Sequence, residues 1–172
     1  MTKTLLQKFE NALRQRNPIL ADRLEGGLPE RRIRDMLHRA KVEGNVEPIV
    51  DLFGWKNGAR ADPSVAQYAS PFPNSEYIFM DLEMMVVDFR GFDELAMYHP
   101  RYANVVGKYF PVFWNGSDCW MAVDLEPSNQ SQVVLIEGQL ENITRPLYDS
   151  FHEFLKDAIR ANEANDKLTC FK

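Results

Sequence analysis

Three acidic side chains lie near one another around a predicted β-hairpin: Asp118, Asp124 and Glu126. Carboxylates grouped in this way can act as a general acid and base, or can gather a cation such as Ca²⁺. No basic or nucleophilic side chain accompanies them at a fixed spacing. Aspartate is also common in turns, because it hydrogen-bonds its own backbone. A hydrated turn, contact with a partner, and catalysis or metal binding are therefore three open interpretations of these residues.

The other residue types that carry chemistry form no known catalytic or metal-binding pattern. His38, His99 and His152 are far apart, and none has a second histidine four residues away, as a zinc-binding helix requires. Cys119 and Cys170 could form one bridge, but we expect reduced thiols, and two cysteines exclude a four-cysteine zinc site. The glycines match no phosphate-binding loop, and no serine lies in a nucleophile-elbow motif. We therefore expect no catalytic residue, no metal and no cofactor.

The charge of the chain points to a basic protein as partner. The 172 residues carry a net charge of −5, and the whole acidic excess lies in residues 87–172, with 8 basic and 13 acidic side chains. Nucleic-acid binding needs clustered Lys and Arg, so direct binding to DNA or RNA is disfavoured. Complementary charge also speeds association between proteins. The one basic cluster is interpreted as a solvated helix face: Arg31, Arg32, Arg34, Arg39 and Lys41.

The sequence predicts neither a signal peptide at its start nor a membrane-spanning stretch. The first residues are polar or basic where a signal peptide needs an unbroken apolar run, and charged residues interrupt every apolar stretch. We expect a cytoplasmic protein.

The tryptophans, Trp55, Trp114 and Trp120, are expected mainly in the core, although buried aromatic residues also anchor interfaces.

The spacing of apolar residues predicts helices first, then strands, then a helix. Helices are expected over 3–15, from Leu28-Pro29 to near Gly44, and over 46–53, with an irregular connection over 59–75. A short strand could cover 76–80, and Asp81 is expected to cap the next helix.

The second half of the chain carries the β signal. Asn115-Gly116 favours a tight turn, so residues 109–114 and 119–125 should form an antiparallel hairpin, followed by a strand over 132–137. Ser150 begins a capping box for a C-terminal helix. The sequence thus predicts one α+β domain over 1–172, with N-terminal helices, a central, mainly antiparallel meander sheet, and a C-terminal helix packed on the sheet.

These elements, in this order, resemble the SUKH superfamily of Smi/Knr-like domains. The matching stretches are Leu28-Pro29 at a helix start, Phe53 to Gly58 after two helices, Phe79 to Glu83 before another helix, Tyr109 to Phe113 before the Asn115–Asp118 turn, Ala122 to Leu125, and Ser150 to Leu155. The resemblance implies an α+β domain with a central antiparallel sheet. It also implies that most bacterial members are non-enzymatic immunity proteins, which bind and neutralise a cognate polymorphic or contact-dependent toxin, often a nuclease or deaminase.

We therefore expect a non-enzymatic immunity protein whose acidic surface binds a basic toxin. The candidate contact residues are Asp118, Trp120, Asp124, Glu126, Glu137 and Glu141. One alternative is a regulatory or scaffolding module that binds another cellular protein. A third interpretation is a hydrolase that uses the carboxylates with His99 or His152; it requires these side chains to converge in one cleft.

Overall fold

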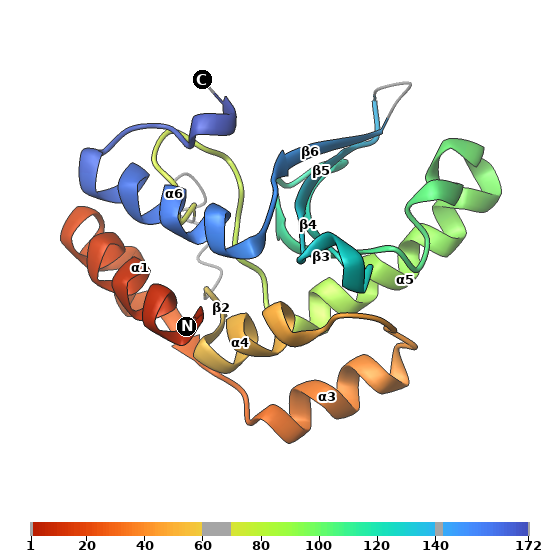
Figure 1. Cartoon of the computed structure of the whole chain (residues 1–172), viewed down its shortest axis with the longest axis horizontal. Helices are drawn as coiled ribbons and strands as arrows, with labels where there is room; N and C mark the ends of the chain where they lie inside the picture. The colour runs from red at the N-terminus through yellow and green to blue at the C-terminus, as the bar shows by residue number, and fades with distance from the viewer. Residues whose placement is uncertain (1, 60–69, 140–142, 172) are drawn as a thin grey trace.

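A computed structural model describes residues 2–59, 70–139 and 143–171 of the chain (Figure 1). Helices come first, then a sheet, then a helix, which confirms the predicted α+β class. Within the described residues, no helix combines the length and the apolar character that crossing a membrane demands. The elements are α1 (Thr2–Arg16), α2 (Pro18–Arg23), β1 (Leu24–Gly26), α3 (Glu30–Arg39), α4 (Glu47–Trp55), β2 (Lys56–Ala59), α5 (Leu82–Tyr98), η2 (Pro100–Asn104), β3 (Tyr109–Trp114), β4 (Cys119–Asp124), η3 (Pro127–Asn129), β5 (Val133–Glu137), β6 (Thr144–Tyr148), α6 (Phe151–Ala164) and η4 (Thr169–Phe171).

Polar side chains fix the starts of several helices. Asp81 accepts a hydrogen bond from the Met84 N–H at 2.8 Å, and the Ser150 hydroxyl accepts one from the Glu153 N–H at 3.2 Å, which confirms both predicted caps. The short helix α2 was not predicted, because the sequence was expected to leave helical structure at Pro18. A new helix begins there instead, since the fixed φ of proline suits a first helical turn.

The main sheet is an antiparallel meander in the order β3-β4-β5-β6. The predicted hairpin is confirmed, with Trp114 opposite Trp120 across the tight turn, and so is the third strand. The fourth strand, β6, was not predicted. It pairs only with β5 and so lies at an edge, where Pro146 is tolerated although it has no N–H. The short strand expected over 76–80 is reduced to a single bridge between Ile78 and Trp114.

Both faces of this sheet are buried against helices. Alternate side chains of β4, Cys119, Met121 and Val123, face a large core that includes residues of α1, α4 and α6, while Trp120 and Ala122 face a smaller core. Helix α5 packs in both cores. Leu82, Met85 and Phe89 lie in the large core, and Phe92 lies in the smaller one. Figure 1 shows α1 and α6 side by side on one side of the sheet and α5 on the other.

An aromatic cluster joins the sheet to its neighbours in the large core. The Phe113 ring of β3 lies 5.0 Å from the ring of Phe72, 5.4 Å from that of Phe79 and 5.7 Å from that of Phe154 on α6. Three segments that are distant in the sequence, the connection with Phe72 and Phe79, strand β3 and helix α6, therefore meet at the Phe113 side chain, which is 1% exposed.

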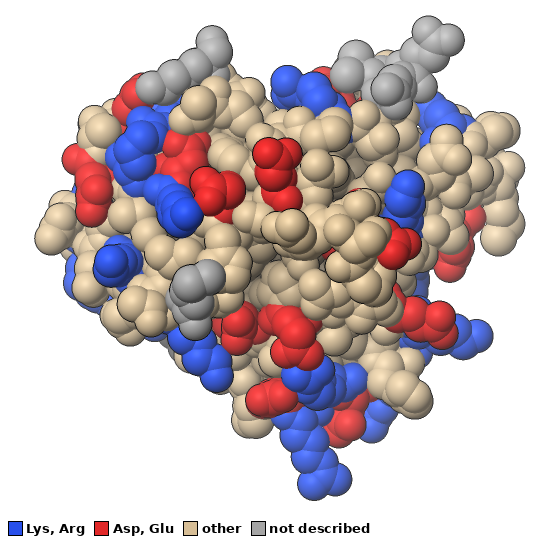
Figure 2. Space-filling model, viewed as in Figure 1, with Lys and Arg blue, Asp and Glu red and all other residues tan. Residues whose placement is uncertain are grey.

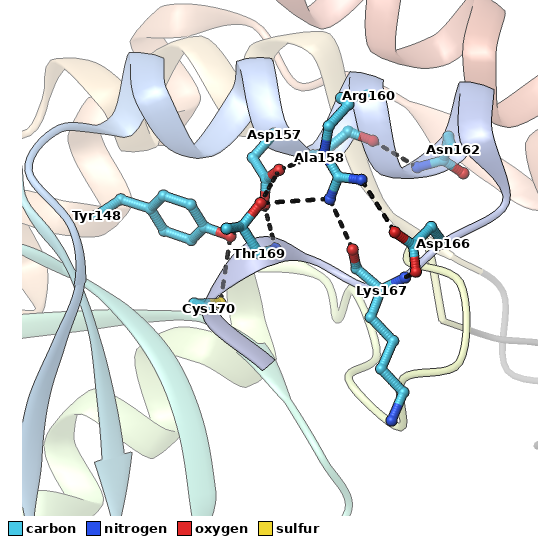
Figure 3. Close-up of polar contacts among 9 residues, drawn as sticks. All are labelled: Tyr148, Asp157, Ala158, Arg160, Asn162, Asp166, Lys167, Thr169 and Cys170. Carbon is cyan, nitrogen blue, oxygen red and sulfur yellow. Dashed lines mark hydrogen bonds and ion pairs between the residues drawn. The ribbon is translucent and has the colours of Figure 1, made fainter. Parts of the chain in front are cut away.

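A polar network fixes the C-terminal tail to α6 (Figure 3). The Asp157 carboxylate accepts hydrogen bonds from the Tyr148 hydroxyl, the Arg160 guanidinium, and both the N–H and the hydroxyl of Thr169, at 2.6 to 2.7 Å. Arg160 also donates to the Lys167 carbonyl at 2.6 Å. Burial acts to raise the pKa of Asp157, but the hydrogen bonds outweigh it and lower this pKa to about 2. The charged form of Asp157 therefore stabilises the tail.

Replacing Phe113 by alanine is expected to lower the free energy of unfolding by about 3–5 kcal/mol, because it leaves a cavity where three segments meet. Denaturant unfolding followed by circular dichroism measures this change. Val87→Ala, at an exposed site on α5, is the control and should shift stability by under about 0.5 kcal/mol. A loss below about 1 kcal/mol for Phe113→Ala would contradict the central role of the cluster.

The Asp157 network predicts acid sensitivity in a defined pH range. The pKa of Asp157 is lower in the folded chain, from an ordinary 3.8 to about 2, so its contribution is complete above about pH 4 and is lost as the pH falls toward 2. This contribution is on the order of 2 kcal/mol. Unfolding curves for the natural chain and for Asp157→Asn should differ at pH 7 and converge near pH 2. Parallel curves at every pH would show that the charge of Asp157 does not stabilise the fold.

Candidate functional site

The predicted contact residues divide between the two ends of the main sheet. Asp118 and Glu137 lie at the end where β4 begins, since Glu137 pairs with Cys119 and the Gly138 N–H donates to the Asp118 carbonyl at 2.8 Å. Asp124 and Glu126 lie at the other end of β4. Six residues of strand place the two groups about 20 Å apart. Glu141 lies outside the described residues.

Asp124 has a clear role within the chain. It is 2% exposed, and its two carboxylate oxygens accept hydrogen bonds from the Glu126 N–H at 2.9 Å and the Asn129 side-chain amide at 2.8 Å. These bonds shape the turn between β4 and β5, as expected for an aspartate in a turn. Glu126, which follows it, is exposed.

Trp120 is a packing residue of the smaller core. It is 7% exposed, its indole N–H donates to the Asp88 carboxylate at 2.8 Å, and its ring meets the Phe92 ring edge-on at 5.2 Å. Burial raises the pKa of Asp88, while the hydrogen bond from Trp120 acts to lower it. Packing alone accounts for these contacts, and a partner role for Trp120 stays a prediction.

The side chains that could carry chemistry are placed on separate elements. His38 lies on α3, His99 follows α5, and His152 lies on α6, 3.2 Å from the Thr2 hydroxyl. Neither the Asp118 nor the Asp124 carboxylate shares a hydrogen bond with any of them in the described parts of the chain. No group of three or more Cys, His, Asp and Glu in the described residues could hold a metal ion.

The two thiols are free, and each contacts a tyrosine. The Cys119 sulfur lies 3.1 Å from the Tyr77 hydroxyl, and the Cys170 sulfur lies 3.2 Å from the Tyr148 hydroxyl. Burial raises the pKa of both thiols, so they stay protonated at neutral pH. This protonated state fits the packing role expected for Cys119.

Four residues of the predicted basic cluster lie on α3, which ends at Arg39, and Lys41 follows it; three of the arginines are paired with acids. Arg34 contacts Glu30 at 2.8 Å and Glu47 at 2.9 Å, and Arg32 contacts Glu83 on α5 at 2.9 Å. Figure 2 shows the same mixture of blue and red side chains over the lower part of the molecule, where α3 lies. The cluster is therefore a solvated helix face, as predicted.

Helix α5 exposes a group of apolar side chains that are not among the predicted contact residues. Large hydrophobic side chains are exposed at five places in the described chain, and four of them are on this helix: Met84 at 42%, Val87 at 61%, Met97 at 78% and Tyr98 at 74%. Val87 and Tyr98 lie three and fourteen residues after Met84, which is close to whole numbers of helical turns. The three side chains therefore form one stripe along the same side of α5. Scattered exposed apolar residues are normal, whereas a large contiguous apolar patch is typical of an interaction surface.

One acidic residue lies on the same side of α5 as this stripe, since Glu94 is seven residues after Val87 and four before Tyr98, whereas Asp93, nine residues after Met84, points to a different side of the helix. Asp93 and Glu94 are exposed, and neither forms an ion pair with another described residue. Tyr102 in η2, which follows the helix, lies beside Asp118. Burial raises the pKa of this tyrosine, and the charge of Asp118 adds a smaller effect in the same direction. One predicted contact residue is thus next to the end of α5. We call Met84, Val87, Glu94 and Tyr98 the α5 surface.

The signal for the α5 surface was present in the sequence. Residues 82, 85, 86 and 89 account for the buried face of a helix over this region, so Met84 and Val87 fall outside it. Counting apolar residues on the second face would have identified the surface.

The chain matches no model of a known protein family and no curated protein. The resemblance to the SUKH superfamily therefore rests on the motifs quoted above.

Proposed function

We propose that this protein is a non-enzymatic immunity protein, which binds and neutralises a cognate bacterial toxin through the α5 surface. The concentration of exposed apolar side chains on one acidic helix carries the proposal. Protein interfaces are enriched in Met and Tyr at their centres and have a polar rim. On α5, Met84, Val87 and Tyr98 supply such a centre, and Glu94 supplies part of such a rim.

The charge of the rim supports a basic partner. Helix α5 contains four acidic residues and one arginine, and Asp118 lies beside the turn that follows it. An acidic rim attracts a basic toxin domain at a distance, which raises the association rate. Fast capture suits a protein that must act before the toxin reaches its substrate. Asp124 and Glu126 lie at the far end of the sheet and are secondary candidates.

The apolar stripe is expected to carry most of the affinity. Val87→Lys and Tyr98→Ala should each weaken the complex with the product of the gene directly upstream at least tenfold, because central apolar residues dominate interface energetics. Growth rescue on co-expression and the dissociation constant of the purified pair measure the effect. Ile19→Lys is the matched control, since Ile19 is 62% exposed but lies on α2.

Three results would count against this assignment. Equal weakening by Ile19→Lys would show that the substitutions act through the fold rather than through α5. Unchanged binding by Val87→Lys and Tyr98→Ala would place the interface elsewhere. Absence of both rescue and a complex at micromolar concentration would remove the toxin partner and favour the regulatory alternative.

The acidic rim is expected to act on the association rate. Glu94→Lys should slow association several-fold in about 50 mM salt and have a smaller effect in about 500 mM salt, because added ions screen exposed charges. Stopped-flow association at the two salt concentrations measures this difference. Glu163→Lys, on the exposed side of α6, is the control. A Glu94 effect that is the same at both salt concentrations would contradict electrostatic attraction by the rim.

A further inference from the structure

A cavity lies at the end of the sheet where β4 begins, apart from the α5 surface. Its volume is about 380 Å³, within the range of about 300 to 1,000 Å³ that is typical of small-molecule sites. Its floor is the sheet face that carries Cys119 and Leu135. One wall is the segment 73–77, and another is the C-terminal tail with Leu168 and Phe171.

The walls of this cavity are held in place without a ligand. The Phe171 ring stacks on the Tyr77 ring with centroids 5.6 Å apart and planes inclined by 12°, and the Tyr77 hydroxyl contacts the Cys119 thiol. The network around Asp157 fixes the tail that carries Phe171 (Figure 3). A cavity between such walls is preorganised, so little ordering opposes binding.

Opposite charges surround the apolar floor. Glu76 and Glu137 supply two carboxylates, and Arg145 and Lys167 supply two cations. No ion pair joins any of the four to another described residue, unlike most of the charged residues on α3. Their charges are therefore available to a ligand.

The register of the sheet places two of these charges near each other. Arg145 on β6 is opposite Leu135 on β5, and Glu137 lies two residues further along β5 on the same face. Diagonal neighbours of this kind have Cα atoms about 7–8 Å apart. A small molecule that carries one charge of each sign can therefore contact both. The planar guanidinium matches a carboxylate with two parallel hydrogen bonds, and a glutamate accepts from an ammonium group.

We propose that this cavity binds a small zwitterionic molecule with an apolar body, of the amino-acid or short-peptide class. Arg145 would bind its carboxylate, Glu137 its ammonium group, and Tyr77, Leu135 and Phe171 its apolar part. The proposal goes beyond the proposed toxin partner and uses none of the residues of the α5 surface. Failure of either proposal therefore leaves the other intact.

Isothermal titration with matched probes tests this site. Leucyl-leucine with free ends should bind, and N-acetyl-leucyl-leucine amide, which lacks both charges, should bind at least tenfold more weakly. Free leucine is the third probe: tighter binding of leucine identifies an amino-acid site, and tighter binding of the dipeptide identifies a peptide site. Arg145→Gln and Glu137→Gln should each reduce the affinity at least tenfold, whereas Arg31→Gln and Glu126→Gln, at exposed positions elsewhere, should not.

Alkylation provides a second readout in the unaltered chain. Cys119 lines the cavity, whereas Cys170 does not, so the ligand should slow the modification of Cys119 by iodoacetamide and leave that of Cys170 unchanged. Equal binding of the blocked and free dipeptides would overturn the proposal, because recognition would then not depend on charge. Absence of binding by all three probes at millimolar concentration would also overturn it.

Discussion

The whole structure depends on burying strand β4 on both of its faces. Every side chain from Cys119 to Asp124 is buried, so each face of the sheet needs its own layer of helices. Helix α5 satisfies part of both requirements, because its first half packs in the large core and Phe92 packs in the smaller one. The opposite side of this helix faces away from both cores. Its exposed apolar residues therefore contribute to neither core, and they are the residues to which we assign binding in the proposed function.

Local sequence signals predicted the elements that depend on local chemistry. The Asn115-Gly116 turn and the aromatic flanks specified the hairpin, and Asp81 and Ser150 specified two helix starts, because caps and tight turns use neighbouring backbone groups. Strand β6 was missed because Thr144 to Tyr148 is short, contains a proline and has no clear alternation. It is a strand because β5 pairs with it, and this pairing is a tertiary effect.

The candidate sites were harder to predict, for a geometric reason. Asp118 and Asp124 are only six residues apart in the sequence. The residues between them form an extended strand, so the two side chains lie at opposite ends of the sheet. The converse holds for the cavity, where Tyr77, Glu137 and Phe171 come from three distant segments. Only the α5 surface could have been found from the sequence, through the helical spacing of its second apolar face.

Hydrogen exchange of the complex tests the central claim most directly, since it locates the partner without altering the chain. We expect the partner to slow amide exchange and protect side-chain labelling over residues 82–98, with a weaker effect near Asp118. Because the amides of a stable helix already exchange slowly, oxidative labelling of Met84 and Tyr98 completes the measurement. Protection confined to the turn from Leu125 to Gln132, with Met84 and Tyr98 still labelled, would contradict the account.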